Sequence, residues 1–188
     1  MDKICAEMIR LRNETTGNAR LCILGGGGFV GKALLPVIRN QYGAIMAIDP
    51  CYRETIHDDN VICTSDPKWI RTADAVLVLT PRGDDAAPYS KYAKVDQIWG
   101  DDTFPDMSPA TQKSIRGKGA MLFKTAMIDK TLRFIPPLPT FGINHVPGCL
   151  ISAMANEKKP GIQGMAHFYK TADTLGLAPM LFPHGRDF

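Results

Sequence analysis

The run Leu21-Cys-Ile-Leu-Gly-Gly-Gly-Gly-Phe-Val-Gly31 limits what this chain can fold into more than any other stretch. A short apolar segment ends in four consecutive glycines, a fifth glycine follows after two residues, and a helical pattern begins at once. Gly26-x-Gly28-x-x-Gly31 has the spacing at which a strand turns tightly into a helix beside a dinucleotide diphosphate. In that arrangement we assign Gly26 to the turn, Gly28 to the approach of the ligand and Gly31 to close packing of helix on strand.

A carboxylate is expected about 20 residues after such a glycine loop, where it accepts a hydrogen bond from a ribose hydroxyl. Asp49 stands there, directly after the apolar run 44–48. This carboxylate favours NAD over NADP because it repels a 2′-phosphate, while Arg53 keeps NADP open. The residues expected to bind the cofactor are those of the glycine loop, this acid and the ends of two strands: Gly25, Gly26, Gly27, Gly28, Phe29, Val30, Gly31, Asp49, Pro50, Thr80 and Pro81.

Strands and helices alternate along the chain, which indicates β-α-β units with right-handed crossovers. The expected strands are 21–24, 44–49, 61–64, 75–81, 97–99, 120–127 and 180–182. The expected helices are 2–13, 32–39, 109–116, 149–157 and 161–175, with one inside 84–95 that begins after Pro88 and another beginning at 65–70. Residues 50–60 are polar and irregular. We therefore expect an α/β fold of the Rossmann-like, doubly wound type with a mostly parallel sheet, in a single domain over 1–188 whose C-terminal half supplies the substrate side.

Composition argues against several classes of partner and site. The formal net charge is +3, and Lys and Arg are scattered without a basic stripe, so nucleic-acid binding is not expected. No apolar run approaches the roughly 18 residues of a membrane helix, and residues 1–7 lack the apolar core of a signal peptide, so no membrane association is expected. The five cysteines form no Cys-x-x-Cys pair, which indicates reduced thiols and a cytoplasmic protein. The four histidines are dispersed, so no metal site is expected.

Polar residues that follow strands are the candidates for chemistry, because ligands bind outside the carboxyl ends of such a sheet. His145 follows Asn144 in a loop, and we expect it to be the catalytic acid or base, since imidazole exchanges protons near neutral pH. We expect Asp102 to orient it or to contact an amine, and Arg82 to clamp a substrate carboxylate. Asp101 and Asn144 are the expected substrate-binding residues.

Each of these candidates has a structural alternative. Arg82 fits a solvated loop, 100–106 fits an ordinary Asp-rich turn, and His145 fits a residue that bonds a backbone carbonyl. Cys149, at an expected helix start, is either a reactive thiol or a buried small side chain. Lys124 lies inside a strand, where a face residue is more usual than a Schiff-base lysine. The histidines not expected to take part are His57, His167 and His184.

The first 85 residues resemble the Rossmann NAD(P)-binding dehydrogenase superfamily. The residues that carry this resemblance are the glycine loop, Asp49 and the strand 75–81. The long glycine run is similar to the cofactor domains of prephenate dehydrogenases, and residues 144–148 are similar to a loop of alanine dehydrogenases. The resemblance implies an oxidoreductase whose nicotinamide cofactor supplies the hydride chemistry. A small polar keto, imino or hydroxy acid is the expected substrate.

Two other classes stay open. Methyltransferases that use S-adenosylmethionine also place a glycine loop after the first strand and an acid after the second, although Gly31 favours a dinucleotide. A non-catalytic dinucleotide-binding subunit or sensor is the third class, favoured by the lack of a separate substrate domain. A homodimer partner would instead complete a one-sided site, so we expect a homodimer.

Overall fold

The structure is a computed structural model that describes residues 1–129, 131–137, 141–158 and 170–184. The chain divides into two compact units, and each is described by itself. The first comprises Met1–Lys124 with Leu181–His184, and the second comprises the described residues of Thr125–Met180. The prediction of one domain over 1–188 stays a prediction. None of the described helices is long and apolar enough to cross a membrane.

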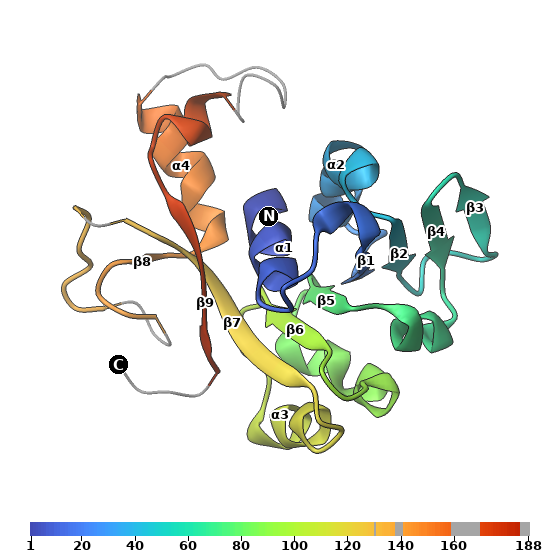
Figure 1. Cartoon of the computed structure of the whole chain (residues 1–188). Helices are drawn as coiled ribbons and strands as arrows, with labels where there is room; N and C mark the ends of the chain where they lie inside the picture. Colours follow the sequence, from blue (N-terminus) through green and yellow to red (C-terminus); the bar gives the residue numbers. More distant parts are fainter. Residues whose placement is uncertain (130, 138–140, 159–169, 185–188) are drawn as a thin grey trace. The chain divides into compact units, whose positions relative to one another are not determined.

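The first unit is built on a sheet whose principal strands are parallel (Figure 1). These strands are β1 (Arg20–Leu24), β2 (Ala44–Ile48), β4 (Val61–Thr64), β5 (Ala75–Val78), β6 (Ile98–Asp101) and β7 (Met121–Ile128), of which the first unit holds the part to Lys124. They pair in the order β4-β2-β1-β5-β6-β7. Counted along the chain, this is the 3-2-1-4-5-6 order of a doubly wound sheet. The Rossmann-like α/β fold is therefore confirmed.

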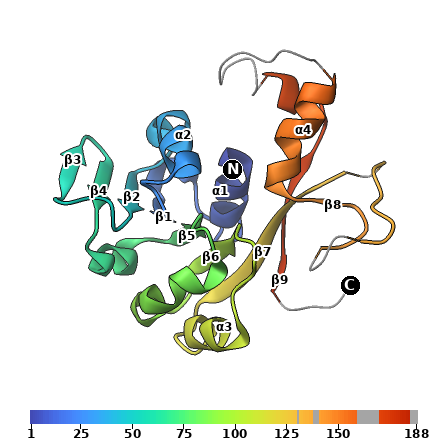
Figure 2. The same ribbon diagram turned by 180° about the vertical axis from the view of Figure 1, so that it is seen from behind.

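Helices lie on both faces of this sheet (Figures 1 and 2). One face carries α1 (Asp2–Arg10) and α2 (Phe29–Ile38), which contact each other, and α1 also contacts β5 and β6. The other face carries the 3-10 helices η3 (Pro67–Thr72) and η4 (Gly83–Tyr92) together with α3 (Pro109–Arg116). Right-handed crossovers place η4 and α3 on one side of β5 and β6, so α1 is needed to cover the other side. The side chains that α1 buries are Ile4, Cys5, Met8 and Ile9.

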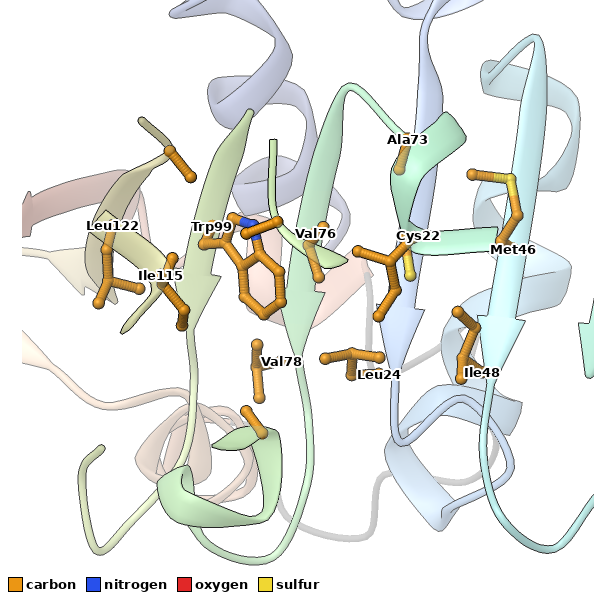
Figure 3. Close-up of a cluster of buried hydrophobic side chains, with 14 of the residues drawn as sticks. Cys22, Leu24, Met46, Ile48, Ala73, Val76, Val78, Trp99, Ile115 and Leu122 are labelled. Carbon is orange, nitrogen blue, oxygen red and sulfur yellow. The ribbon is translucent and has the colours of Figure 1, made fainter. Parts of the chain in front are cut away.

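A cluster of buried apolar side chains fills the face under η3, η4 and α3 (Figure 3). Its members include Cys22, Leu24, Met46, Ile48, Val76, Val78, Trp99, Ile115 and Leu122. Trp99 is fully buried, and its Nε1 donates a hydrogen bond to Gln97 Oε1 at 2.9 Å. The Gln97 amide donates in turn to the carbonyl oxygens of Ile70 and Ala73 at 2.8 and 2.9 Å. The polar atoms inside this core are therefore paired, as burial requires.

Four elements of the first unit differ here from the sequence expectation: β3, η3, η4 and β5. Residues 50–60 were expected to be irregular, but β3 (Ile56–Asp58) pairs antiparallel with β4 at the sheet edge. All three of its residues are exposed, so no apolar alternation marked it. The helices η3 and η4 are 3-10 rather than α-helical, and η4 contains Pro88, which lacks the N–H that an α-helix uses. β5 ends at Val78 rather than at Pro81.

The second unit is organised on the C-terminal half of β7. β8 (His145–Val146) pairs antiparallel with it, with Met127 opposite Val146 and Ile128 opposite His145. α4 (Gly148–Lys158) follows, as predicted. β9 (Ala178–Pro183) also pairs with β7, and its residues up to Met180 belong to this unit. Most of the helix expected at 161–175 lies outside the described residues, with helical backbone at 170–173.

Candidate functional site

The turn that follows β1 depends on Gly25. Its φ of +83° is a conformation that residues with a Cβ rarely adopt, and a Cβ there would lie 2.8 Å from the Leu79 carbonyl oxygen. The Gly25 N–H donates to the Ile48 carbonyl oxygen at 2.9 Å, which joins the turn to the end of β2. The left-handed residue of the turn is therefore Gly25 rather than Gly26. Gly26 instead lies against β2, where a Cβ would come within 2.7 Å of the Ala47 Cβ.

Gly31 and Gly28 set the contact between this turn and α2. A Cβ at Gly31 would lie 2.6 Å from both the Gly25 carbonyl oxygen and the Gly26 Cα, so only glycine lets α2 pack this closely. Gly28 is the exposed N-cap of α2 and has an extended backbone. A Cβ there would meet only the Gly25 oxygen, at 3.2 Å. The spacing predicted this packing role for Gly31, and the space outside Gly28 is open.

The start of α2 has the properties of an anion site. The first N–H groups of any helix have no acceptor within it, and the helix dipole makes this end positive. No side chain caps α2 at Gly28. The side chains of Phe29 and Val30 are 90% and 46% exposed. A diphosphate could accept hydrogen bonds from these amides.

Asp49 holds the glycine turn from the end of β2. Its Oδ2 accepts from the Gly27 N–H at 3.1 Å, and its Oδ1 accepts from the Cys51 N–H at 2.9 Å. The Cys51 thiol lies directly against the turn, since a Cβ at Gly27 would come within 2.2 Å of its Sγ. Pro50 is exposed beside them. Each carboxylate oxygen can accept a further hydrogen bond, so Asp49 retains capacity for ribose hydroxyls.

Residues after β5 form the other side of the switch point. The Leu79 N–H donates to the Leu24 carbonyl oxygen at 2.8 Å, so the ends of β1 and β5 stay paired. A Cβ at Gly25 would lie 3.1 Å from the Thr80 nitrogen. The glycine turn and the predicted contacts Thr80 and Pro81 therefore share one edge of the sheet.

Arg82 and Asp102 also lie at this edge. The Asp102 N–H donates to the Val78 carbonyl oxygen at 3.1 Å, which places this half-buried residue beside the end of β5. Arg82 is exposed, and its backbone N–H donates to Asp85 Oδ2 at 3.0 Å. Its carbonyl oxygen accepts from Thr80 Oγ1 at 2.9 Å. The backbone of Arg82 is thus fixed while its guanidinium is exposed to solvent.

Asp101 does not lie in an Asp-rich turn, which was the structural alternative for 100–106. It is the last residue of β6 and is fully buried. Its Oδ1 accepts from the N–H and the Oγ1 of Thr103, at 3.0 and 2.6 Å, and its Oδ2 lies 2.7 Å from His184 Nε2. The expected strand 97–99 was too short, because the apolar pattern ends before the buried carboxylate begins. Direct substrate binding by Asp101 stays a prediction.

Lys124, on β7, brings a positive charge to the same cluster. Its Nζ lies 2.7 Å from Asp106 Oδ1 and 3.8 Å from Asp101 Oδ2, and it donates to the Thr103 carbonyl oxygen. Burial alone would raise the pKa of Asp101, but the His184 hydrogen bond, the Lys124 charge and the Thr103 hydrogen bond hold it below its ordinary value. Lys124 thus pairs with the buried Asp101 and the half-buried Asp106, which agrees with a strand-face residue and not with a Schiff-base lysine.

His184 is the residue of this cluster that sequence reasoning set aside. It follows β9, is 5% exposed, and its carbonyl oxygen accepts from Arg116 Nη2 at 3.0 Å. It is 83 residues from Asp101 in the chain, so no local spacing could pair them. One feature of the sequence could have indicated His184 as a candidate, namely its position just after an expected strand. Among the described residues, no group of three or more His, Cys, Asp or Glu is placed to hold a metal ion.

His145 and Asn144 belong to the second unit. His145 lies in β8 rather than in a loop and is 3% exposed. Its Nδ1 accepts from the Gly142 N–H at 2.9 Å, and burial lowers the pKa of its imidazole. The Asn144 carbonyl oxygen accepts from the Asp129 N–H at 3.2 Å. The catalytic role of His145 stays a prediction, and the side chain of Cys149 lies outside the described residues.

No protein-family model matches the sequence, and no curated protein matches it significantly. Solved structures that it resembles include an NDP-N-acetyl-D-galactosaminuronic acid dehydrogenase from Methanosarcina mazei Go1, at 12% identity and TM-score 0.45 over 65% of this chain and 36% of that chain. An NAD-dependent formate dehydrogenase from Staphylococcus aureus in complex with NAD has 12% identity and TM-score 0.47 over 61% and 37%. A D-isomer specific 2-hydroxyacid dehydrogenase from Lactobacillus delbrueckii ssp. bulgaricus, NAD complexed form, has 13% identity and TM-score 0.44 over 90% and 52%.

The chain spans between 36% and 52% of the length of these three proteins. The sheet order of the first unit, with its glycine turn at the reversal point, is what assigns it to the Rossmann fold.

Proposed function

We propose that the first unit binds a nicotinamide dinucleotide across the ends of β1, β2 and β5, and that the protein is an NAD(P)-dependent oxidoreductase. The observation that carries this proposal is the open space outside Gly28 at the start of α2. That space lies where the strand order reverses, between β1 and β5. Ligands of doubly wound sheets bind at this point.

The residues present there fit such a cofactor. Its diphosphate would lie over Gly28 and accept from the first amides of α2. Asp49 would accept from the hydroxyls of the adenosine ribose, next to the exposed Pro50. Thr80 and Pro81 would border the cofactor from the β5 side. When bound, the nicotinamide accepts or donates the hydride, and the protein supplies position and a proton.

NAD is the proposed cofactor, with NADP as the second choice. The Asp49 carboxylate would repel a 2′-phosphate. Its two oxygens are already bound to the N–H groups of Gly27 and Cys51, which fixes the negative charge at the ribose position. Lys32 and Arg53 are exposed nearby in the chain and would be the groups to attract a 2′-phosphate.

The proposed substrate is a small polar keto, imino or hydroxy acid. The exposed Arg82, at the end of β5, is suited to pair with its carboxylate. Asp102 lies at the same edge and could contact a substrate amine or orient a catalytic group. His145, Asn144 and Asp101 remain the candidates from sequence for proton transfer and substrate contact. A homodimer that completes the substrate side is part of this proposal, and gel filtration tests it.

Calorimetric titration of the purified chain with NADH, NADPH and S-adenosylmethionine tests the cofactor assignment. We expect NADH to bind most tightly and to quench the fluorescence of Trp69 and Trp99. Gly28→Ala should weaken NADH binding by at least about tenfold, because the new methyl group occupies the path of the diphosphate. Gly17→Ala is the matched control, since a Cβ there meets nothing within 4 Å.

The titration also separates the alternatives. Binding of S-adenosylmethionine without NADH or NADPH would show a methyltransferase and overturn the proposal. Tight NADH binding without turnover of any keto, imino or hydroxy acid would show a non-catalytic subunit or sensor. Equal NADH affinity in the Gly28→Ala variant and the wild type would place the diphosphate elsewhere.

A further inference from the structure

The buried cluster around Asp101 lies close to the proposed cofactor. Asp101 ends β6, which pairs with β5, and β5 pairs with β1 before the glycine turn. Neighbouring strands are about 4.8 Å apart, so two spacings place Asp101 about 10 Å from the glycine turn along the sheet edge. The hydrogen bond from Asp102 to Val78 keeps the ends of β6 and β5 together.

The pairing of Asp101 with His184 fixes one proton on the imidazole. The pKa of Asp101 is held below its ordinary value, so its carboxylate is an acceptor only. The 2.7 Å contact therefore requires that His184 Nε2 carries the hydrogen and donates it. Within the described part of the chain, Nδ1 of His184 makes no hydrogen bond. The ring is thus oriented by a carboxylate at one nitrogen and keeps the other for proton exchange.

Charged side chains from neighbouring elements belong to the same cluster as His184. β6 contributes Asp101, the loop after it contributes Asp106, and β7 contributes Lys124. These three groups carry a net charge of −1 (two carboxylates and one ammonium). From α3, the Arg116 guanidinium reaches the His184 carbonyl oxygen and not its ring.

We propose that His184, oriented by Asp101, is the acid–base group of this site, and the inference rests on the proposed oxidoreductase function. In the oxidation of a hydroxy acid, His184 Nδ1 would accept the hydroxyl proton while the C=O bond forms, and a bound nicotinamide would take the hydride from the same carbon. In the reverse direction, Nδ1 returns that proton to the carbonyl oxygen. Asp101 stays ionised throughout and stabilises the imidazolium.

The test combines kinetics with a measurement that needs no turnover. His184→Gln should lower kcat at least about 100-fold and remove the histidine limb of the pH profile, while NADH binding is retained. His57→Gln is the matched control, because His57 is exposed on β3 at the opposite edge of the sheet. Nitrogen NMR of the histidine-labelled wild type should show His184 as the Nε2–H form at high pH. In Asp101→Asn this preference should be lost.

Each possible outcome supports or contradicts the proposed role of His184. Unchanged kcat and pH profile in His184→Gln would overturn the inference, as would loss of the limb in His145→Gln alone. If His184→Gln does not fold, Asp101→Asn and the wild-type NMR spectrum still decide, and an Nδ1–H form would overturn the pairing. Failure of the wild type to bind either dinucleotide would instead contradict the proposed function. The NMR spectrum would still show whether His184 is paired with Asp101.

Discussion

Gly25 and Gly28, at the proposed cofactor site, differ in backbone conformation and in the space around them. Gly25 has positive φ, and a Cβ there would press on the Leu79 carbonyl oxygen, whereas Gly28 is extended and open. We expect Gly25→Ala to lower the free energy of unfolding by about 2 kcal/mol or more. Gly28→Ala should lower it by about 1 kcal/mol or less, because a Cβ there would meet only the Gly25 carbonyl oxygen, at 3.2 Å. Urea unfolding of both variants measures the difference. Similar losses in both would mean that the turn is not built as described.

Removal of the Lys124 ammonium should destabilise the first unit. Lys124→Met would leave the buried Asp101 and the half-buried Asp106 without their shared ammonium, and losing one partner of a buried ion pair costs about 3–5 kcal/mol. The control is Lys94→Met, since Lys94 is partly exposed and Asp74 keeps its bonds to Arg20. Surface pairs of that kind are worth about 1 kcal/mol or less. Equal stability losses in the two variants would contradict the buried network.

The same cluster predicts how stability responds to acid. The pKa of Asp101 is lowered in the folded chain, so its contribution is fully present above the ordinary value near 3.8 and is lost as the pH falls below it. Burial opposes this lowering, while His184, Lys124 and Thr103 cause it. In Lys124→Met the stability should therefore fall less steeply with acid than in the wild type. Unfolding free energies at pH 7, 5 and 3 test this, and an equal slope in both proteins would count against it.

Among the helices and strands, α1 covers a face of the sheet that the crossover connections leave uncovered. It covers β5 and β6 from the face opposite η4 and α3, with Met8 fully buried. Met8→Ala should destabilise the chain by about 2–5 kcal/mol, because it opens a cavity against the sheet. Arg10→Ala, on the exposed side of the same helix, should leave the stability unchanged. Thermal unfolding of both variants measures this, and a tolerated Met8→Ala would mean that α1 does not seal the core.

The helices and strands that could be predicted are those whose burial produces a recognisable pattern of apolar residues or of capping residues in the sequence. β1, β2 and β5 are apolar runs because both of their faces are covered, and Ser108 and Pro109 mark the start of α3. β3 has three exposed residues and shows no pattern. The glycine spacing predicted the packing at Gly31, but it could not tell Gly25 from Gly26 as the left-handed residue. That distinction depends on where the Leu79 carbonyl of the neighbouring strand lies.

In the whole chain, the candidate site also has a part that could be predicted from the sequence and a part that could not. The cofactor side follows from one contiguous stretch and an acid about 20 residues on, so sequence alone predicted it. The pairing of Asp101 with His184 joins residues 83 apart, and only the folded sheet brings them together. His145 stood out in the sequence because of its surroundings, yet it lies in the second unit with its Nδ1 bonded to Gly142. Long-range pairing is the part of a site that spacing cannot show.

Ligand binding should also be visible in the stability of the whole chain. A ligand that binds only the folded state adds about 2.7 kcal/mol at a concentration 100 times its Kd. NADH should therefore raise the unfolding temperature, NADPH should raise it less because of Asp49, and S-adenosylmethionine should leave it unchanged. Gly28→Ala should need a higher NADH concentration for the same shift, since its fold is intact but the diphosphate fits less well. A shift with S-adenosylmethionine alone would reverse the cofactor assignment, because stabilisation must follow the ligand that the glycine turn holds.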